Sequence, residues 1–368
     1  MKIAVVKLGA RVSYSSQGTS GGTGEAISII NMLKSYADVT VFTKILKKDK
    51  NPDDVTFVDI EDDCNTANFD ALVVINGSVN FFGGAEDWHQ IMNYKIINEF
   101  DGPIFYTYCD PELTLRNIWP SVSVKEWASN WKQEDIELKN EEIIWLCQPY
   151  NTDFVQENLK KNVVFPKKLV HFPFEKFPCM NERLPFNENP SVDLSYGGTM
   201  RGGKRIEKMV KFYFGHEKIN VEMFGKIELK DFPKKKLINN PAPPKFTGPV
   251  KYDQMLTKMN DALAHVVIGD PFYEKSSDVA QRTYESIWSS VVTFIDADLD
   301  KEKRVYGKSP ILSDFLYVSS RKDVEDKILA LKGNKEIRKQ IVDLQFKTVN
   351  FDKDAYCKSF IDTIKEEI

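Results

Sequence analysis

The chain has 368 residues, of which 42% are hydrophobic, whereas a single hydrophobic core usually stops growing at ~250 to 300 residues. We therefore expect two globular lobes. The 50 basic and 54 acidic residues give a net charge of −4, which excludes a generally cationic nucleic-acid binder but permits a local basic groove. The five scattered cysteines form no C-x-x-C pair and indicate no metal site. We expect neither a signal peptide nor a membrane span, and hence a cytoplasmic protein.

The first half of the chain alternates short apolar runs with segments of helical periodicity. Lys2 to Leu8 predicts a β-branched strand, and Glu25 to Ala37 predicts a helix with one apolar stripe. Further strands are expected at residues 39–43, 71–75, 103–108 and 143–147, with helices at 87–99 and 153–160. This alternation predicts a parallel sheet that helices cover on both faces.

A proline-punctuated segment from Phe172 to Pro190 interrupts this pattern, and we place the interdomain linker there. The alternation then resumes. Strands are expected at residues 192–196, 221–224, 264–268 and 291–295, and helices at 204–214, 252–260, 278–289 and 324–331. The last segment, residues 355–368, carries one apolar stripe and predicts a helix that needs a surface to cover.

The strongest local motif is YGGTMRGGKR, from Tyr196 to Arg205, which follows a strand and opens a helix. Its glycines permit close backbone approach, and the helix N-terminus offers free N–H groups to a pyrophosphate. Arg201 and Arg205 add two positive charges suited to bidentate binding of a departing diphosphate. The alternative is an ordinary glycine turn with two solvated arginines. A Walker A loop is excluded because its lysine signature is missing.

Three carboxylates are further candidates. Arg282 and Glu285 lie three residues apart and so share a helix face, where the pair could hold a phosphate and a ribose or form a surface ion pair. Asp110 directly follows an expected strand and precedes a proline, which suits a general base or a helix cap. Glu25 is the rival carboxylate and could instead complement a helix dipole.

The segment NFFGG, from Asn80 to Gly84, places two adjacent phenylalanines after a strand. Exposed phenylalanine pairs are costly, so either they fold into the core or they stack on a base. Lysines near residues 44–50, 160–168 and 234–236 could contact DNA phosphates, although a solvated face also accounts for each run.

Several segments together resemble the T-even phage DNA β-glucosyltransferase family, in that family's order and over nearly the whole chain. They are KIAVV, INGSVNFFGG, the Asp110 strand with Trp119-Pro120 after it, YGGTMRGGKR, EMFGK, FTGP, and VIGD followed by QRTYES. The resemblance implies an α/β GT-B fold of two Rossmann-like lobes with a deep interlobe cleft. It implies an acceptor and DNA lobe over residues 1–175, a UDP-sugar lobe over 180–350, and a C-terminal helix, 354–368, that packs back on the first lobe.

The implied activity transfers a sugar from a UDP-sugar to the hydroxymethyl group of 5-hydroxymethylcytosine in duplex DNA, with inversion. This modification would protect phage DNA from host nucleases. The resemblance makes Asp110 the catalytic base and Glu25 a second carboxylate near the sugar. The implied donor site comprises Gly198, Thr199, Arg201, Arg205, Phe224, Gly225, Arg282 and Glu285. The implied acceptor loop is Asn80, Phe81, Phe82, Gly83 and Gly84, near a flipped base.

Family members keep an activity-supporting Mg or Mn at the diphosphate and not in a cage of protein ligands, so the resemblance implies no metal-ligating residue. Asp296-Ala297-Asp298 imitates the D-x-D metal motif of other glycosyltransferases, but we interpret it as structural because it closes a strand. We expect a monomer in the cytoplasm of the infected host cell.

The loop SYSSQGTSGGTGE before the first helix departs from the resemblance, since it is longer and richer in glycine than expected of the glucose enzymes. Because this loop carries Glu25 towards the sugar, UDP-glucose and UDP-arabinose both stay open as donors. A UDP-sugar transferase for a small-molecule or lipid acceptor is the alternative function, and a non-enzymatic DNA-binding relic is a third.

Overall fold

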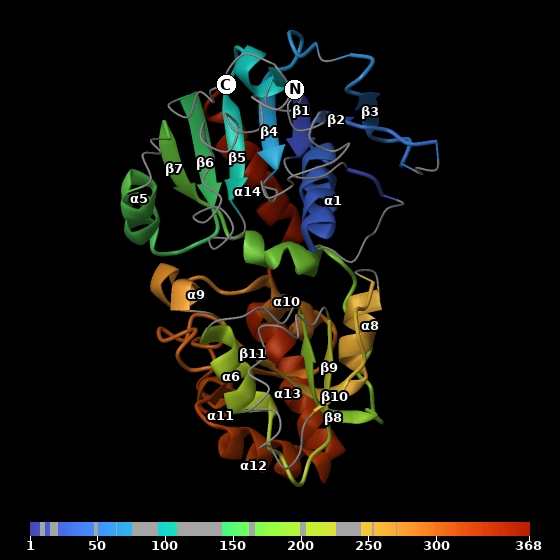
Figure 1. The fold of residues 1–368 in the computed structure, drawn as a ribbon, viewed down its shortest axis with the longest axis vertical. Helices are drawn as coiled ribbons and strands as arrows, with labels where there is room; N and C mark the ends of the chain where they lie inside the picture. Colours follow the sequence, from blue (N-terminus) through green and yellow to red (C-terminus); the bar gives the residue numbers. More distant parts are fainter. Residues whose placement is uncertain are drawn as a thin grey trace. The chain divides into compact units, whose positions relative to one another are not determined.

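The computed structural model describes most of the chain as two compact units, Met1–Phe177 with Asp352–Ile368, and Pro178–Phe351 (Figure 1). The described residues are 1–7, 12–14, 21–47, 51–63, 65–75, 95–108, 142–161, 166–198, 204–225, 244–251, 254–269 and 271–368. None of the helices in these segments has the length and apolar character needed to cross a bilayer.

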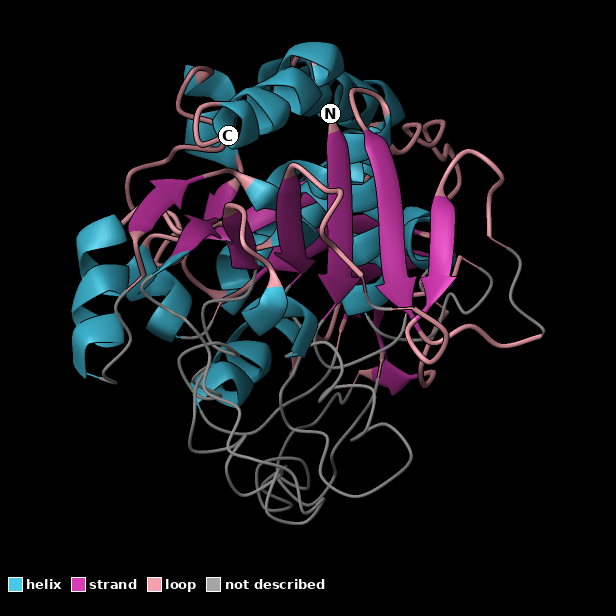
Figure 2. Ribbon diagram, turned by 90° about the horizontal axis from the view of Figure 1, so that it is seen from above, coloured by secondary structure: helices cyan, strands magenta, loops and turns pink. Residues whose placement is uncertain are grey.

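The first unit is built on a parallel sheet of seven strands in the order β3-β2-β1-β4-β5-β6-β7. The strands are β1 (Lys2–Lys7), β2 (Asp38–Thr43), β3 (Thr56–Asp59), β4 (Ala71–Ile75), β5 (Ile104–Tyr108), β6 (Ile143–Cys147) and β7 (Lys168–His171). Every residue of β4 and β6 is buried, because helices cover both faces of a parallel sheet (Figure 2). This burial explains why the two strands have continuous apolar sequences.

The described helices of the first unit include α1 (Gly21–Lys34), α5 (Thr152–Lys161) and α14 (Lys353–Lys365). The chain's last helix, α14, lies among the elements of this unit and packs on α1 (Figure 1). Its buried residues Phe360 and Tyr356 contact the Phe172 ring at centroid distances of 4.9 and 5.1 Å. The helix therefore covers apolar surface that the first 177 residues leave exposed.

The second unit holds a parallel sheet of six strands in the order β10-β9-β8-β11-β12-β13. The strands are β8 (Val192–Gly197), β9 (Val221–Phe224), β10 (Lys245–Phe246), β11 (Ala262–Val267), β12 (Val292–Asp296) and β13 (Tyr317–Val318). Its helices among the described residues are α6 (Lys204–Tyr213), α8 (Met255–Asn260), α9 (Pro271–Ser276), α10 (Gln281–Trp288), α11 (Pro310–Phe315), α12 (Arg321–Lys332) and α13 (Lys335–Val349). Two parallel sheets with flanking helices confirm the α/β prediction.

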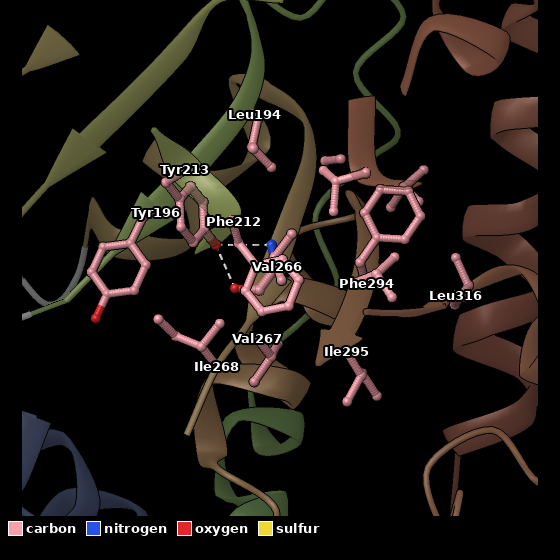
Figure 3. Close-up of a cluster of buried hydrophobic side chains, with 14 of the residues drawn as sticks. Leu194, Tyr196, Phe212, Tyr213, Val266, Val267, Ile268, Phe294, Ile295 and Leu316 are labelled. Carbon is pink, nitrogen blue, oxygen red and sulfur yellow. Dashed lines mark hydrogen bonds between the residues drawn. The ribbon is translucent and has the colours of Figure 1, made fainter. Parts of the chain in front are cut away.

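Helix α6 is fixed to the central strand β11 by a buried hydroxyl (Figure 3). The Tyr213 hydroxyl accepts from the N–H of Val266 at 3.0 Å and donates to the carbonyl of the same residue. Both groups are shut off from solvent, so the hydroxyl satisfies polar backbone atoms inside an apolar cluster. The contact sets the position of α6 on the sheet.

The structure corrects several sequence predictions. The segment from Phe172 to Pro190 is not wholly irregular, because residues Phe174–Met180 form a 3-10 helix, η2. The sequence analysis missed α13 altogether, since two of its buried residues are the polar Arg338 and Gln345, which hide the apolar stripe. It also missed the short elements β3, β7, β10, β13, α9 and α11. Of the helix expected at residues 87–99, the described part is 95–99, which is helical.

His265 lies in the middle of β11 and is fully buried. Burial, followed by the positive charge of Arg282, lowers the pKa of its imidazole from 6.5 to about 3. The folded protein therefore keeps this side chain neutral in mildly acidic solution.

We expect His265 to make the protein acid-sensitive. Below pH 6.5 the unfolded chain binds a proton at His265, whereas the folded chain does not. The contribution of His265 to the free energy of unfolding is therefore constant above pH 6.5, and this free energy falls as the pH drops towards 3. The expected decrease is about 1.4 kcal/mol per pH unit. Urea unfolding of wild type and His265→Gln between pH 7.5 and 4.5 measures it. Equal slopes for the two proteins would contradict the assignment.

Candidate functional site

The carboxyl ends of β8, β9 and β10 are joined by backbone hydrogen bonds that extend beyond the strands. The N–H of Gly198 donates to the carbonyl of Phe224 at 3.0 Å, and the N–H of Gly225 donates to the carbonyl of Gly248 at 2.8 Å. Ligands of open α/β sheets bind outside the carboxyl ends of the strands. The three strand ends therefore form a connected edge where a ligand site is expected.

Gly198 and Gly225 approach each other so closely that no side chain fits between them. A Cβ added to Gly225 would lie 1.9 Å from the carbonyl oxygen of Gly198. Both residues also have positive φ angles, +151° for Gly198 and +135° for Gly225, which L-residues rarely adopt. A Cβ at Gly197 would meet the Phe224 ring at 2.5 Å. Backbone packing therefore requires glycine at position 225, the φ angle favours it at 198, and the Phe224 ring favours it at 197.

Helix α6 begins beside this edge and carries Arg205 in its first turn. Burial raises the pKa of the Tyr213 hydroxyl well above its usual range, while the charges of Arg282 and Arg205 act in the opposite direction. Both guanidinium groups thus lie within electrostatic range of one buried hydroxyl. Arg205 of α6 and Arg282 of α10 thus both act on one buried hydroxyl.

Helix α10 supplies a second charged pair. Arg282 Nη1 lies 2.7 Å from Glu285 Oε2, with side-chain exposures of 24% and 8%, so the pair is not a solvated surface contact. Arg282 also lies 3.8 Å from the sulfur of Met259 in α8. No side chain caps the start of α10 at Ala280. A carboxylate and a guanidinium held this way at a helix start can bind a hydroxyl and a phosphate.

The D-x-D doublet closes β12, and its first carboxylate is occupied by an ammonium group. Asp296 is fully buried and accepts a hydrogen bond from Lys208 of α6. Lys208 also forms an ion pair with Glu274 of α9. Within the described residues no group of three or more His, Cys, Asp or Glu side chains could hold a metal ion. The first carboxylate of the doublet is thus paired with a lysine.

In the first unit, Glu25 lies within α1 and is half-buried. The helix begins at Gly21 and not at Glu25, so this residue is the fifth of α1 and lies outside the first turn. The helix-dipole interpretation of Glu25 is therefore wrong. Strand β5 ends at Tyr108 and leads to Asp110, which lies outside the described residues.

The remaining predicted site residues also lie outside the described part of the chain. They are Thr199, Arg201 and the segment Asn80, Phe81, Phe82, Gly83 and Gly84. Lys208 and Glu274 were not predicted, and Gly248 was noted only within the FTGP segment, because their roles depend on tertiary neighbours. A weak signal existed for Lys208, since it lies three residues after Arg205 and thus on the same helix face.

Comparisons with known proteins show what this chain is similar to. Residues 1–178 match the family model described as bacteriophage T4 beta-glucosyltransferase. The DNA beta-glucosyltransferase of Enterobacteria phage T4 is 28% identical over 359 residues, covering 95% of each chain. Both matches are to T4 β-glucosyltransferases. This confirms the resemblance inferred from the ordered motifs.

Solved structures agree with this similarity. A T4 phage enzyme in complex with UDP and Mn²⁺ has a TM-score of 0.79 at 26% identity, with 99% of both chains covered. An α-glucosyltransferase with UDP and a 13-mer DNA has a TM-score of 0.66 at 13% identity, covering 99% of both chains, which shows a shared fold. AviGT4, a glycosyltransferase of avilamycin A biosynthesis, shares the fold at a TM-score of 0.56 and 10% identity, covering 100% of this chain and 97% of its own. The fold is GT-B.

We expect Gly225→Ala to destabilise the second unit. The added methyl group would overlap the Gly198 carbonyl and force a positive φ on alanine, at a cost of roughly 2–4 kcal/mol. Urea unfolding of wild type and variant measures this loss in the free energy of unfolding. The control is Gly333→Ala, because a Cβ there meets nothing within 4 Å and φ is −81°. Equal stabilities of the two variants would show that the edge can relax.

Proposed function

We propose that this protein transfers a sugar from a UDP-sugar to the hydroxymethyl group of 5-hydroxymethylcytosine in duplex DNA, with inversion at the anomeric carbon. The product would protect phage DNA from host nucleases. The observation that carries the proposal is 28% identity to a DNA beta-glucosyltransferase over 95% of both chains. The charges of Arg205 and Arg282, which both act on the buried Tyr213 hydroxyl of the second unit, give it a chemical basis.

In this proposal the second unit holds the donor. Arg201 and Arg205, with Gly198 and Thr199, bind the diphosphate at the start of α6 and stabilise the charge on departing UDP. Phe224 and Gly225 lie near the nucleotide, and the close backbone approach at Gly225 supports this placement. A bound Mg or Mn ion would be held by the diphosphate oxygens and would offset their charge.

Arg282 and Glu285 divide the remaining donor contacts. Glu285 accepts hydrogen bonds from the ribose hydroxyls, while the other N–H groups of Arg282 reach a phosphate. Their ion pair at 2.7 Å supports this division, because it fixes both side chains before the nucleotide arrives. Pre-organised charges lose little conformational entropy on binding.

In the first unit, Asp110 removes the proton from the hydroxymethyl group, whose oxygen attacks the anomeric carbon in line as UDP leaves. Glu25 lies near the sugar. Asn80, Phe81, Phe82, Gly83 and Gly84 approach the acceptor base, which must leave the DNA stack to reach a protein-bound donor. The protein acts as a monomer in the cytoplasm of the infected cell. The parallel strand β5, which ends two residues before Asp110, supports the placement of the base.

The decisive assay offers UDP-glucose and UDP-arabinose in parallel to duplex DNA that contains 5-hydroxymethylcytosine, with mass as the readout. We expect a hexose increment from UDP-glucose, the donor bound in a solved T4 relative. A pentose increment would assign the alternative donor. No increment on DNA, with transfer to a small-molecule or lipid acceptor, would reject the DNA substrate. The matched control is Asp110→Asn, which we expect to lose transfer but to keep UDP binding, because the base is removed without touching the donor site.

We expect Glu285→Gln to weaken UDP binding roughly tenfold, because a neutral amide accepts weaker hydrogen bonds than a carboxylate. Wild type should bind UDP more tightly than 2′-deoxy-UDP, and the variant should lose this preference. Calorimetry measures both affinities. Glu325→Gln is the control, since that carboxylate pairs with His216 at 3.2 Å and has no assigned donor role. An unchanged preference in Glu285→Gln would remove Glu285 from the ribose.

A further inference from the structure

Lys208 joins three elements of the second unit. Its ammonium donates to Asp296 at the end of β12, pairs with Glu274 of α9, and lies 3.8 Å from Asp298. These partners are distant in sequence, since 88 positions separate Lys208 from Asp296. One side chain thus links the first half of α6 to the end of β12 and to α9, which follows the neighbouring strand β11.

The charges in this cluster make the link difficult to replace. Asp296 is fully buried, and a buried carboxylate without a partner costs several kcal/mol. Lys208 is itself only 15% exposed. Burial alone would lower the pKa of the ammonium, but Asp296 and Glu274 outweigh this effect and raise it. The lysine therefore stays charged and in place at neutral pH.

Helical spacing connects this anchor to Arg205. The two residues lie three positions apart in α6 and so project from the same face of the helix. Arg205 is in the first turn, and Lys208 is held one turn later by β12 and α9. An anchor so close to the helix start restricts the tilt and rotation of that turn.

We propose that Lys208 is a positioning residue for Arg205: its ion pairs with Asp296 and Glu274 hold the start of α6 where the guanidinium meets the diphosphate. The D-x-D doublet accordingly binds a lysine of its own chain and not a metal ion. The inference rests on the proposed function, in which Arg205 binds the diphosphate.

The test separates positioning from stability. Lys208→Met leaves the buried Asp296 unpaired and lowers the urea midpoint. The double variant Lys208→Met with Asp296→Asn removes that unpaired charge, so we expect its midpoint to recover towards wild type. We expect its dissociation constant for UDP to stay raised by at least about tenfold, because the anchor is still missing. In transfer assays the KM for the UDP-sugar rises while the KM for DNA stays constant.

The matched control is the ion pair of Lys332 with Asp193, 2.9 Å apart at the amino end of β8 in the same sheet. We expect Lys332→Met with Asp193→Asn to bind UDP like wild type. Wild-type UDP affinity in the Lys208 and Asp296 double variant would overturn the proposal. An equal loss in the control pair would overturn it too, because the effect would then reflect general destabilisation.

The experiment also distinguishes this inference from the proposed function. Absence of UDP binding by the wild-type protein would reject the function, and the positioning role with it. UDP binding and DNA transfer by wild type, together with unchanged UDP affinity in the double variant, would reject the positioning role alone.

Discussion

The close contact between Gly198 and Gly225 is the constraint on which the second unit's site depends. Backbone atoms of two strand ends occupy the space that a side chain would need, and hydrogen bonds to Phe224 and Gly248 hold them there. This leaves main-chain atoms, not side chains, at the kind of edge where open α/β sheets bind ligands. The charged residues act around this rigid edge.

Around that edge, charges are fixed by partners within the protein before any ligand arrives. Arg282 is held by Glu285 in α10, and Lys208 is held by Asp296 at the end of β12. Both acidic partners are buried, so each pair combines a firm position with a desolvated charge. Pre-organisation of this kind suits a reaction whose leaving group gains negative charge.

The sequence predicted the wholly apolar strands well and missed a helix whose buried face is partly polar. Strands such as β4 and β6 are wholly apolar, and their predicted bounds match the structure. Helix α13 was missed because Arg338 and Gln345 are buried through hydrogen bonds to backbone atoms of distant segments. The glycine and arginine motif was visible because its chemistry is local. The partners of Lys208 were not, because residues 88 positions apart meet only through the fold.

The position of α14 has a consequence for biosynthesis. The second unit is one continuous stretch, Pro178–Phe351, whereas the first unit needs the last segment, Asp352–Ile368. Translation proceeds from the N-terminus, and domains tend to fold as their chain emerges. The first unit can therefore bury Phe172 against Phe360 only after the whole second unit has been synthesised. The half of the protein that is made first is the last to be completed.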